Sequence, residues 1–558
     1  MVKFIQPVVG LARRTVPALL LLLLARLAAA QVLPWQSATA VSGSATATAT
    51  DAAGNVYVAG SFTGTLSVAG VTLTSAGATD VFVAKYRPGG SPAWVQRAGG
   101  AGPDEARALV VSGAGVYVAG TSTGGAAFGS TTLPGAATAA VGFVAKLADA
   151  GSSAGFVWAQ AAGQEARALA VQGSGVFVAG NFAGTATFGS TTLTSTGFSD
   201  MFVARLTDAG AASSYAWVQR SGGPDFEGAT ALAATPAGAV YVAGYYVGRA
   251  TFGPTALANA GSYDVFVAKI QDNATSGAFA WALPAGGPGA DQALALAANG
   301  TSVYVAGSYL VAATFGALSL GNGTAGDAFV AKVTDAGASA AYTWAQRAGG
   351  PGTDAAQALA VAGADVYVAG AVGGAAQFGA LAPAFAGGYD VFVAKLTDAG
   401  AAAAYAWAQT AGGAGNDSAR ALAFAPGVPG GGLYVVGAAS PPAAFGALAL
   451  GGAAGRTTSF VALLAAQPLA TASVQALAAG VSLYPNPASG RVTVQLPAIP
   501  GAPTATIALL DALGRILRTQ ASATHHKTEL DLTGIAPGLY AVRVAAGGRS
   551  ATQRLVVE

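Results

Sequence analysis

The chain has 558 residues, of which 53% are hydrophobic and 9% charged, with a formal net charge of +2 and no cysteine. The lack of cysteine excludes disulfides, thiol catalysis and thiolate metal sites, so packing has to stabilise the fold. The small net charge argues against nucleic-acid binding. Beyond the N-terminal leader no unbroken apolar run reaches the about 18 residues that span a membrane.

The N-terminus has the pattern of an export signal. A short apolar run, Val16–Ala25, follows three basic residues and is interrupted by Arg26. We therefore predict a signal peptide over residues 1–30, with cleavage between Ala30 and Gln31, rather than a membrane anchor. The basic residues are Lys3, Arg13 and Arg14.

Two short phrases and a tryptophan each occur seven times after the leader, at a period of roughly 60 residues. Because Val, Tyr, Phe and Trp favour strands and Gly and Asp punctuate them, each repeat predicts four short strands. VYVAG or a variant begins at Val56, Val116, Val176, Val240, Val303, Val366 and Leu433. FVAK or a variant begins at Phe82, Phe143, Phe202, Phe266, Phe329, Phe392 and Phe460. The tryptophans are Trp35, Trp94, Trp158, Trp217, Trp281, Trp344 and Trp407.

The position of Trp35 distinguishes a closed ring of sheets from an open stack. The other six tryptophans follow a FVAK phrase, whereas Trp35 precedes the first repeat and the last repeat lacks a tryptophan. If the Trp35 strand completes the last sheet, the array closes without exposed terminal repeats. We therefore predict an all-β fold with a seven-bladed β-propeller over residues 31–465, and keep an open solenoid as the alternative.

A further segment in each repeat lies between the second and third predicted strands. A phenylalanine followed by glycine recurs there, so we expect a small hairpin or folded loop that this ring pins to the sheet. The phenylalanines are Phe188, Phe252, Phe315, Phe378 and Phe445.

Several of these phrases resemble the bacterial β-propeller repeats called SBBP repeats. They include DAAGNVYVAGSF at Asp51–Phe62, GGPGTDAAQALAV at Gly349–Val361 and DVFVAKL at Asp390–Leu396. The resemblance covers about residues 33–465. It implies a propeller, and no activity comes with it.

The composition changes after the repeats. Residues 466–480 are rich in alanine and uncharged, which predicts a linker. Residues 481–558 contain short alternating segments typical of a small Ig-like β-sandwich. In RVTVQL the alternation predicts that Val492, Val494 and Leu496 point inward.

This C-terminal segment is similar to the type A C-terminal sorting domain of the type IX secretion system of Bacteroidetes. The similarity covers the whole segment and implies recognition by the outer-membrane secretion machinery, then release or attachment at the cell surface. An ordinary sandwich acting in adhesion is the alternative. The residues that carry the sorting signal in this interpretation are Tyr484, Pro485, Asn486, Pro487, Gly514, Arg515, Gly538 and Tyr540.

The sequence contains few candidates for catalysis. Its two histidines, His525 and His526, lie in the C-terminal segment, so a Ser–His–Asp triad is impossible in the repeats. Two sets of aspartates follow the repeat, which favours turn caps over a catalytic pair. We predict no catalytic residue, metal ligand or cofactor. The aspartates are Asp80, Asp200, Asp264, Asp327 and Asp390 before third strands, and Asp104, Asp291, Asp354 and Asp417 before first strands.

The fourth repeat departs from its sisters. It carries Phe226, Tyr245 and Arg249 where other repeats have mostly small residues, a combination suited to a sugar or peptide ligand. We predict a monomeric, non-enzymatic protein that binds or displays a glycan or protein outside the cell. An extracellular polysaccharide lyase or hydrolase, and a purely structural surface component, remain the alternatives.

Overall fold

The computed structural model describes residues 33–136, 138–321, 325–428, 430–453, 455–467, 481–497, 503–511, 516–546 and 549–558. The predicted cleavage site at Ala30 and Gln31 lies outside these ranges, as do Gly514 and Arg515. The described residues form strands, turns and loops, and they include no helix that could cross a membrane. Contacts divide the chain into two compact units, with the boundary after Gln467.

The described residues of unit 1 contain seven larger sheets, each built on four antiparallel strands, and four separate two-stranded sheets. Sheet 1 has β2 (Ser44–Thr50), β3 (Val56–Phe62), β6 (Asp80–Tyr86) and β7 (Pro92–Gly100). Sheet 2 has β8 (Glu105–Ser112), β9 (Gly115–Thr123), β12 (Ala140–Asp149) and β13 (Ala154–Ala161). Sheet 3 has β14 (Glu165–Gln172), β15 (Gly175–Phe182), β18 (Asp200–Asp208) and β19 (Ser213–Ser221).

The remaining sheets repeat this order, and β1 supplies the last strand of sheet 7. Sheet 4 has β20 (Glu227–Ala234), β21 (Ala239–Tyr246), β24 (Asp264–Asp272) and β25 (Gly277–Ala285). Sheet 5 has β26 (Gln292–Asn299), β27 (Ser302–Tyr309), β30 (Asp327–Asp335) and β31 (Ala340–Gly349). Sheet 6 has β32 (Ala355–Ala362), β33 (Asp365–Val372), β35 (Asp390–Asp398) and β36 (Ala403–Gly413). Sheet 7 has β37 (Ser418–Ala425), β38 (Gly432–Ala439), β41 (Thr458–Ala465) and β1 (Trp35–Val41).

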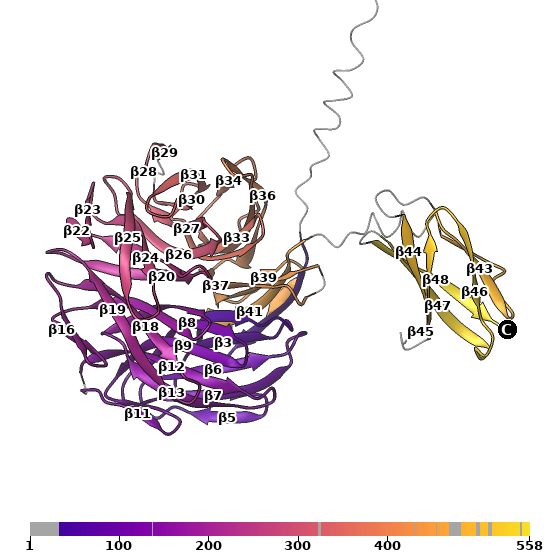
Figure 1. Cartoon of the computed structure of the whole chain (residues 1–558), viewed down its shortest axis with the longest axis horizontal. Helices are drawn as coiled ribbons and strands as arrows, with labels where there is room; N and C mark the ends of the chain where they lie inside the picture. Colours follow the sequence, from indigo (N-terminus) through magenta and orange to yellow (C-terminus); the bar gives the residue numbers. More distant parts are fainter. Residues whose placement is uncertain are drawn as a thin grey trace, which may run out of the picture. The chain divides into compact units, whose positions relative to one another are not determined.

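The sheets follow one another around a propeller-like ring (Figure 1). The first strand of each sheet contacts the first strand of the next, and β37 of sheet 7 contacts β2 of sheet 1. β1 pairs antiparallel with β41, with Trp35 opposite Leu464 and Ala40 opposite Phe460. The indole of Trp35 meets the ring of Phe445 edge-on at 5.0 Å between centroids. The strand ahead of the first repeat therefore completes the last sheet.

Hydrophobic clusters lie between neighbouring sheets, one at each of the seven junctions. The cluster at the junction of sheets 7 and 1 joins Val436 and Tyr434 to Val58 and Phe82. Each sheet is thus covered on both faces, which explains why β3, with the sequence VYVAGSF, is buried along its whole length. Because similar sheets pack against both faces, these strands lack the alternation of polar and apolar residues that is usual in a sheet with one solvent-facing side.

The segment between the second and third strands folds into a hairpin in six of the seven sheets, as the sequence predicts. The recurring phenylalanine is buried against the FVAK phenylalanine, for example Phe252 against Phe266 at 4.7 Å. In sheet 6 a single short strand, β34 (Gln377–Phe378), replaces the hairpin. The hairpins are β4 (Thr65–Val68) with β5 (Val71–Thr74), β10 (Ala126–Phe128) with β11 (Thr131–Leu133), β16 (Thr185–Phe188) with β17 (Thr191–Thr194), β22 (Arg249–Phe252) with β23 (Thr255–Ala258), β28 (Ala313–Phe315) with β29 (Leu318–Leu320), and β39 (Ala443–Phe445) with β40 (Leu448–Leu450).

A buried aspartate at the end of the third strand connects each sheet to the one before it through a tyrosine, a lysine and a tryptophan at four junctions. At a fifth junction, Asp272 of sheet 4 is bound by Arg205 and Trp217 of sheet 3. Asp335 of sheet 5 accepts hydrogen bonds from Tyr241 and Lys269 at 2.7 Å and from the Trp281 indole at 3.0 Å, all in sheet 4. We call this arrangement the aspartate junction. Its other aspartates are Asp149, Asp208 and Asp398.

Unit 2 contains a three-stranded sheet and a four-stranded sheet that share one hydrophobic cluster. Val492, Val494 and Leu496 are buried in this cluster, as the alternation in RVTVQL predicts. The strands of the first sheet are β42 (Ser482–Tyr484), β43 (Arg491–Gln495) and β46 (Lys527–Asp531). Those of the second are β45 (Ile516–Ala523), β44 (Thr504–Leu510), β47 (Gly538–Ala546) and β48 (Arg549–Val557).

Candidate functional site: the first-strand face of unit 1

One end of the sheets in unit 1 carries the exposed large apolar side chains. This end, which we call the first-strand face, is where the first and third strands of every sheet begin. It is formed by the connections from second to third strands and from fourth strands to the next sheet. Six of the seven large apolar residues exposed in the described part of unit 1 lie in the loops of these connections, namely Phe198, Phe226, Leu310, Val311, Phe385 and Tyr389. The seventh, Val71, lies at the turn of the β4–β5 hairpin.

Phe198 and Phe226 form the most exposed aromatic pair on this face. Their rings are stacked, with centroids 5.0 Å apart and an interplanar angle of 9°, and 66% and 46% of the two residues is exposed. The backbone beneath them is held in place, because the carbonyl of Asp225 accepts hydrogen bonds from the amides of Phe198 and Ser199. Two flat apolar rings are therefore presented to solvent on an ordered loop pair.

The three residues predicted as a ligand patch lie in different settings. Phe226 stacks on Phe198, whereas Tyr245 meets Tyr263 edge-on at 5.4 Å. Arg249, at the start of β22, lines a separate cavity of about 410 Å³ with the β22–β23 hairpin. The described contacts thus do not join all three residues into one site.

Glu227 is a buried carboxylic acid next to this patch. It is 1% exposed, and neither carboxylate oxygen has a hydrogen bond of good geometry. Burial, opposed in part by the nearby Gly223 amide and reinforced by Asp200, raises the pKa of Glu227 to about 8. The side chain is therefore a neutral acid over much of the physiological range, with Phe226 immediately before it in the chain.

The aspartates that precede first strands cap backbone amides, as the repeat pattern predicts. Asp291 accepts hydrogen bonds from the amides of Gly287 at 2.7 Å and Leu310 at 2.9 Å. The same two-amide arrangement occurs at Asp104, Asp354 and Asp417. These carboxylates are occupied by the fold and do not converge. In the described part of the chain no three His, Asp or Glu side chains come together as a metal site requires.

The aspartates that begin third strands have a second kind of partner. In sheets 1, 3 and 5 an arginine on the fourth strand, opposite the FVAK phenylalanine, forms an ion pair with the aspartate. The pairs are Asp80–Arg97 at 2.5 Å, Asp200–Arg220 at 2.6 Å and Asp327–Arg347 at 2.8 Å.

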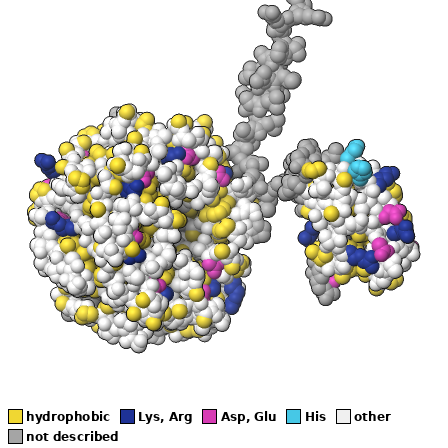
Figure 2. Space-filling view, viewed as in Figure 1, with side chains coloured by type: hydrophobic (Ala, Val, Ile, Leu, Met, Phe, Trp, Pro, Cys, Tyr) yellow, Lys and Arg dark blue, Asp and Glu magenta, His cyan; other side chains and the backbone are white. Residues whose placement is uncertain are grey.

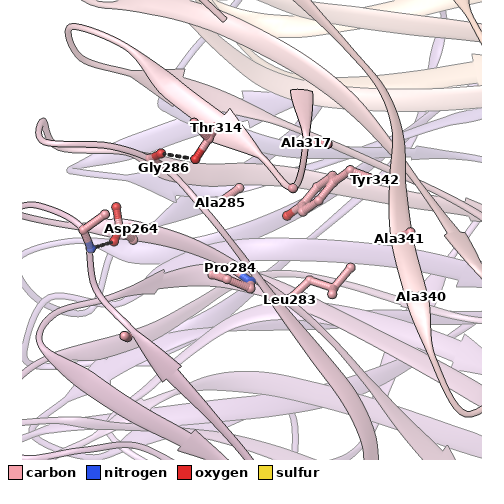
Figure 3. Close-up of a pocket in the computed structure, with 13 residues that line it drawn as sticks. Asp264, Leu283, Pro284, Ala285, Gly286, Thr314, Ala317, Ala340, Ala341 and Tyr342 are labelled. Atoms are coloured by element: carbon pink, nitrogen blue, oxygen red, sulfur yellow. Dashed lines mark hydrogen bonds between the residues drawn. The ribbon is translucent and has the colours of Figure 1, made fainter. Parts of the chain in front are cut away.

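Sheet 4 departs from this pattern at Asp264. Pro284 occupies the register position opposite Phe266 that arginine holds in the sister sheets. Asp264 is 2% exposed, one of its oxygens accepts the amide of Ala260, and Oδ1 has no hydrogen-bond partner. Asp264 lines a cavity of about 470 Å³ between sheets 4 and 5, shown in Figure 3. The cavity is also lined by Leu283, Pro284, Gly286, Thr314 and Tyr342.

In unit 2 the described sorting-signal residues connect the start of the unit to its last strand. Asn486 donates to the carbonyl of Arg554 at 2.7 Å and accepts the amide of Val556 at 2.9 Å. The hydroxyl of Tyr540 donates to the carbonyl of Ala536 at 2.8 Å, and Gly538 begins β47. Tyr484 is 39% exposed beside Lys527, whose ammonium lies 5.6 Å from the ring centroid.

Residues 482–558 match a family described as the secretion system C-terminal sorting domain. This match covers nearly all of unit 2 and confirms the similarity to type IX sorting domains seen in the sequence. The chain is a propeller-like all-β cargo that type IX secretion delivers to the cell surface or the medium.

None of the curated proteins matches this chain. Among solved structures, Trypanosoma rangeli sialidase in complex with sialic acid is 8% identical, covers 84% of this chain and 85% of its own, and has a TM-score of 0.30. The same sialidase with the inhibitor DANA is 9% identical, with coverages of 84% and 86% and a TM-score of 0.32. Aspergillus kawachii beta-fructofuranosidase complexed with glycerol is 12% identical, with coverages of 95% and 89% and a TM-score of 0.21. Likenesses this weak carry no functional argument.

Sequence reasoning missed Phe198 and the exception at Asp264. Phe198 lies two residues before Asp200, one of the aspartates that begin third strands, and nothing in that position marks it. Only the fold brings its ring onto Phe226. The exception at Asp264 is visible in the sequence, because the arginine that ends WVQR at Trp94 and Trp217 and WAQR at Trp344 is replaced by proline in WALP at Trp281. The significance of that arginine became clear only once its partner was known.

Proposed function

We propose that unit 1 is a seven-bladed β-propeller that serves outside the cell as a non-enzymatic, monomeric binding module. Its contact surface is the first-strand face, and its ligand is a glycan or a protein. Unit 2 is a small Ig-like β-sandwich that acts as the sorting domain. The assignment of the repeats to the SBBP type and the N-terminal signal peptide remain predictions of the sequence.

The concentration of exposed apolar side chains on one face carries this proposal. A soluble surface gains nothing from a stacked, solvent-exposed pair such as Phe198 and Phe226, whereas a binding surface uses such rings to cover the apolar face of a sugar or peptide. Figure 2 shows charged side chains scattered among apolar and uncharged ones on the visible side of unit 1. Propeller frames keep such loops rigid, which reduces the entropy lost on binding.

Binding to glycan and peptide arrays tests the proposal with the full-length protein. We expect saturable binding that falls about a hundredfold or more in a Phe198→Ser/Phe226→Ser variant, because two lost contacts of about 1.5 kcal/mol each add to about 3 kcal/mol. Val71→Ser, which removes an exposed apolar side chain from the turn of the β4–β5 hairpin and not from the loops of this face, is the control and should bind like the wild type. Unchanged binding by the double variant would contradict the assignment of the face.

An extracellular polysaccharide lyase or hydrolase is the second candidate, and the unpartnered acid of Glu227 favours it. A carboxyl group with a pKa near neutrality suits proton transfer. Incubation with polysaccharides distinguishes the two functions. Turnover that is lost in Glu227→Gln, together with silence on every array, would reverse the order of the candidates.

A further inference from the structure

We propose that the cavity between sheets 4 and 5 binds a guanidinium group supplied by another molecule. The inference concerns Asp264 and its cavity, so it is independent of the stacked phenylalanines and of the function proposed above. It rests on a comparison among repeats of the same chain. Three of the five aspartates that begin third strands are paired with an arginine, whereas Asp264 and Asp390 are not. Of these two, Asp264 lines a described cavity.

The sister sheets define what this position binds. In sheet 5 the guanidinium of Arg347 forms two hydrogen bonds with Asp327, from Nε at 2.8 Å and from Nη2 at 3.0 Å. Such a fork is the geometry that carboxylates and guanidinium groups prefer. The backbone around Asp264 follows the same register, so its carboxylate is placed to accept a guanidinium in the same way.

In sheet 4 no cation from the described part of the chain reaches this carboxylate. Proline replaces the arginine, and the residues that line the cavity include no Lys, Arg or His. The amide of Gly287 lowers the pKa of Asp264, but it donates its hydrogen bond of good geometry to Asp291 at 2.7 Å, and Oδ1 of Asp264 accepts none. An isolated buried carboxylate is costly, and an external cation would compensate it.

The cavity also fits the rest of an arginine side chain. Its volume of about 470 Å³ lies within the range of ligand pockets. Leu283 and Pro284 supply apolar walls against which an aliphatic stem packs. Figure 3 shows the hydroxyl of Tyr342 pointing into the cavity from the side opposite Asp264. This hydroxyl is buried and has no partner, so it is a second acceptor for the N–H groups of a guanidinium.

The backbone at position 286 lies so close to two carboxylates that there is no room for a side chain there. A Cβ at this position would collide with Oδ1 of Asp264 and would lie 2.8 Å from Oδ2 of Asp291. The fold therefore keeps the space beside the two carboxylates free of side chains. The guanidinium has two sources outside the cell, a small free guanidine or an arginine side chain of a peptide or protein.

Calorimetric titration of the full-length protein tests the proposal with two probes. The probes are agmatine and the blocked tripeptide Gly-Arg-Gly, each compared with a neutral counterpart, which for the peptide is citrulline in place of arginine. We expect one binding event per chain and at least tenfold weaker binding of the citrulline peptide. Binding of agmatine alone indicates a small guanidine, and binding of both probes indicates an arginine side chain. Binding of neither probe overturns the proposal.

Two variants locate the site. Asp264→Asn should weaken agmatine binding at least tenfold. Pro284→Arg should abolish agmatine binding, since the new side chain occupies the site as arginine does in the sister sheets. The same variant should raise the melting temperature, which distinguishes occupation of the site from misfolding. Asp390→Asn is the matched control, because Asp390 also has an unpartnered oxygen but lines neither of the two cavities described. Undiminished binding by Asp264→Asn or by Pro284→Arg, or loss of binding by Asp390→Asn, would assign the ligand elsewhere.

Discussion

Glu227 occupies the position at which four other sheets carry an aspartate that caps two amides. Its side chain is one methylene longer than that of Asp104, and the two-amide fit is lost, so both of its oxygens are unpartnered. Burial also raises the pKa of Asp104 to about 6, although two amides oppose the rise. The longer side chain thus replaces a structural cap with an acid whose pKa is raised further, to about 8 compared with about 6 for Asp104.

Stability should depend on pH through Glu227. Because the folded pKa of about 8 exceeds the unfolded value of about 4.5, folding favours the neutral acid, and this stabilisation is lost as the pH rises from 4.5 to 8. Glu227→Gln removes the titration, so the variant should gain on the order of 3 kcal/mol over the wild type at pH 8 and little at pH 4. Urea denaturation at several pH values measures the difference.

The control for this prediction is Glu105→Gln. Glu105 begins β8 and is exposed, with an ion pair to Arg107 at 3.4 Å. Exposed pairs contribute little to stability, so this variant should follow the wild-type pH dependence. Parallel curves for Glu227→Gln and the wild type would contradict the burial of an unpartnered acid.

At the scale of elements, the aspartate junction connects neighbouring sheets through three donors on one carboxylate. Burial alone would raise the pKa of Asp335, but hydrogen bonds from Lys269 and Tyr241 outweigh it and hold the pKa below its ordinary value. The junction is absent on both sides of sheet 7 in the described residues. Lys395 pairs with Asp365 of its own sheet at 2.7 Å, and the hydroxyl of Tyr434 has no partner.

Asp335→Ala should destabilise the protein by about 3 to 5 kcal/mol, since it leaves the buried ammonium of Lys269 without its partner. Asp365→Ala removes a more exposed partner and should cost about 1 kcal/mol. The lowered pKa means that the stabilisation by Asp335 is present above pH 4 and is lost as the pH falls through the folded pKa. Chemical denaturation at pH 7 and at pH 3 measures both effects, and equal losses for the two variants would contradict the role of burial.

β1 is the element that completes sheet 7. Trp35 is 8% exposed and packs on Phe445, whereas its neighbour Gln36 points to solvent. Trp35→Ala should therefore cost about 3 to 5 kcal/mol in thermal or urea unfolding. Gln36→Ala, on the same strand, should change stability by less than about 0.5 kcal/mol. A neutral Trp35→Ala variant would show that β1 does not hold the last sheet.

At the scale of the whole molecule, the two units have separate tasks. Unit 1 owes its stability to seven apolar junctions and carries the exposed rings and the cavity at Asp264. Unit 2 has its own hydrophobic cluster and matches the sorting domain over residues 482–558. Delivery to the cell surface or the medium is thus encoded in unit 2, whose described residues form their own hydrophobic cluster.

Deletion of residues 482–558 should retain the protein in the periplasm, because the outer-membrane machinery then has no sorting domain to recognise. Cell fractionation followed by immunoblotting of the periplasm, surface and medium measures the distribution, with the full-length chain as the control. Appearance of the truncated chain in the medium in the usual amount would contradict the role of the tail.

Repetition made much of unit 1 predictable from its sequence. The phrases VYVAG and FVAK became buried second and third strands, and the Phe–Gly segments became hairpins, because strand propensity and local turns act over a few residues. The count of tryptophans anticipated that β1 pairs with β41. Val492 and Val494 could be placed inward for the same local reason.

The candidate site was predicted only in part. Phe226 was recognised as a departure from the repeat, but its partner Phe198 was not, and Arg249 lines a different cavity. The sequence by itself determined the repeat, the strands, the closing strand and the sorting tail, since each depends on residues close together or on counting. Only the tertiary structure decided which carboxylates are paired, because the partner of Asp264 or Asp335 comes from another strand or another sheet. Whether a buried charge is compensated is a property of that packing.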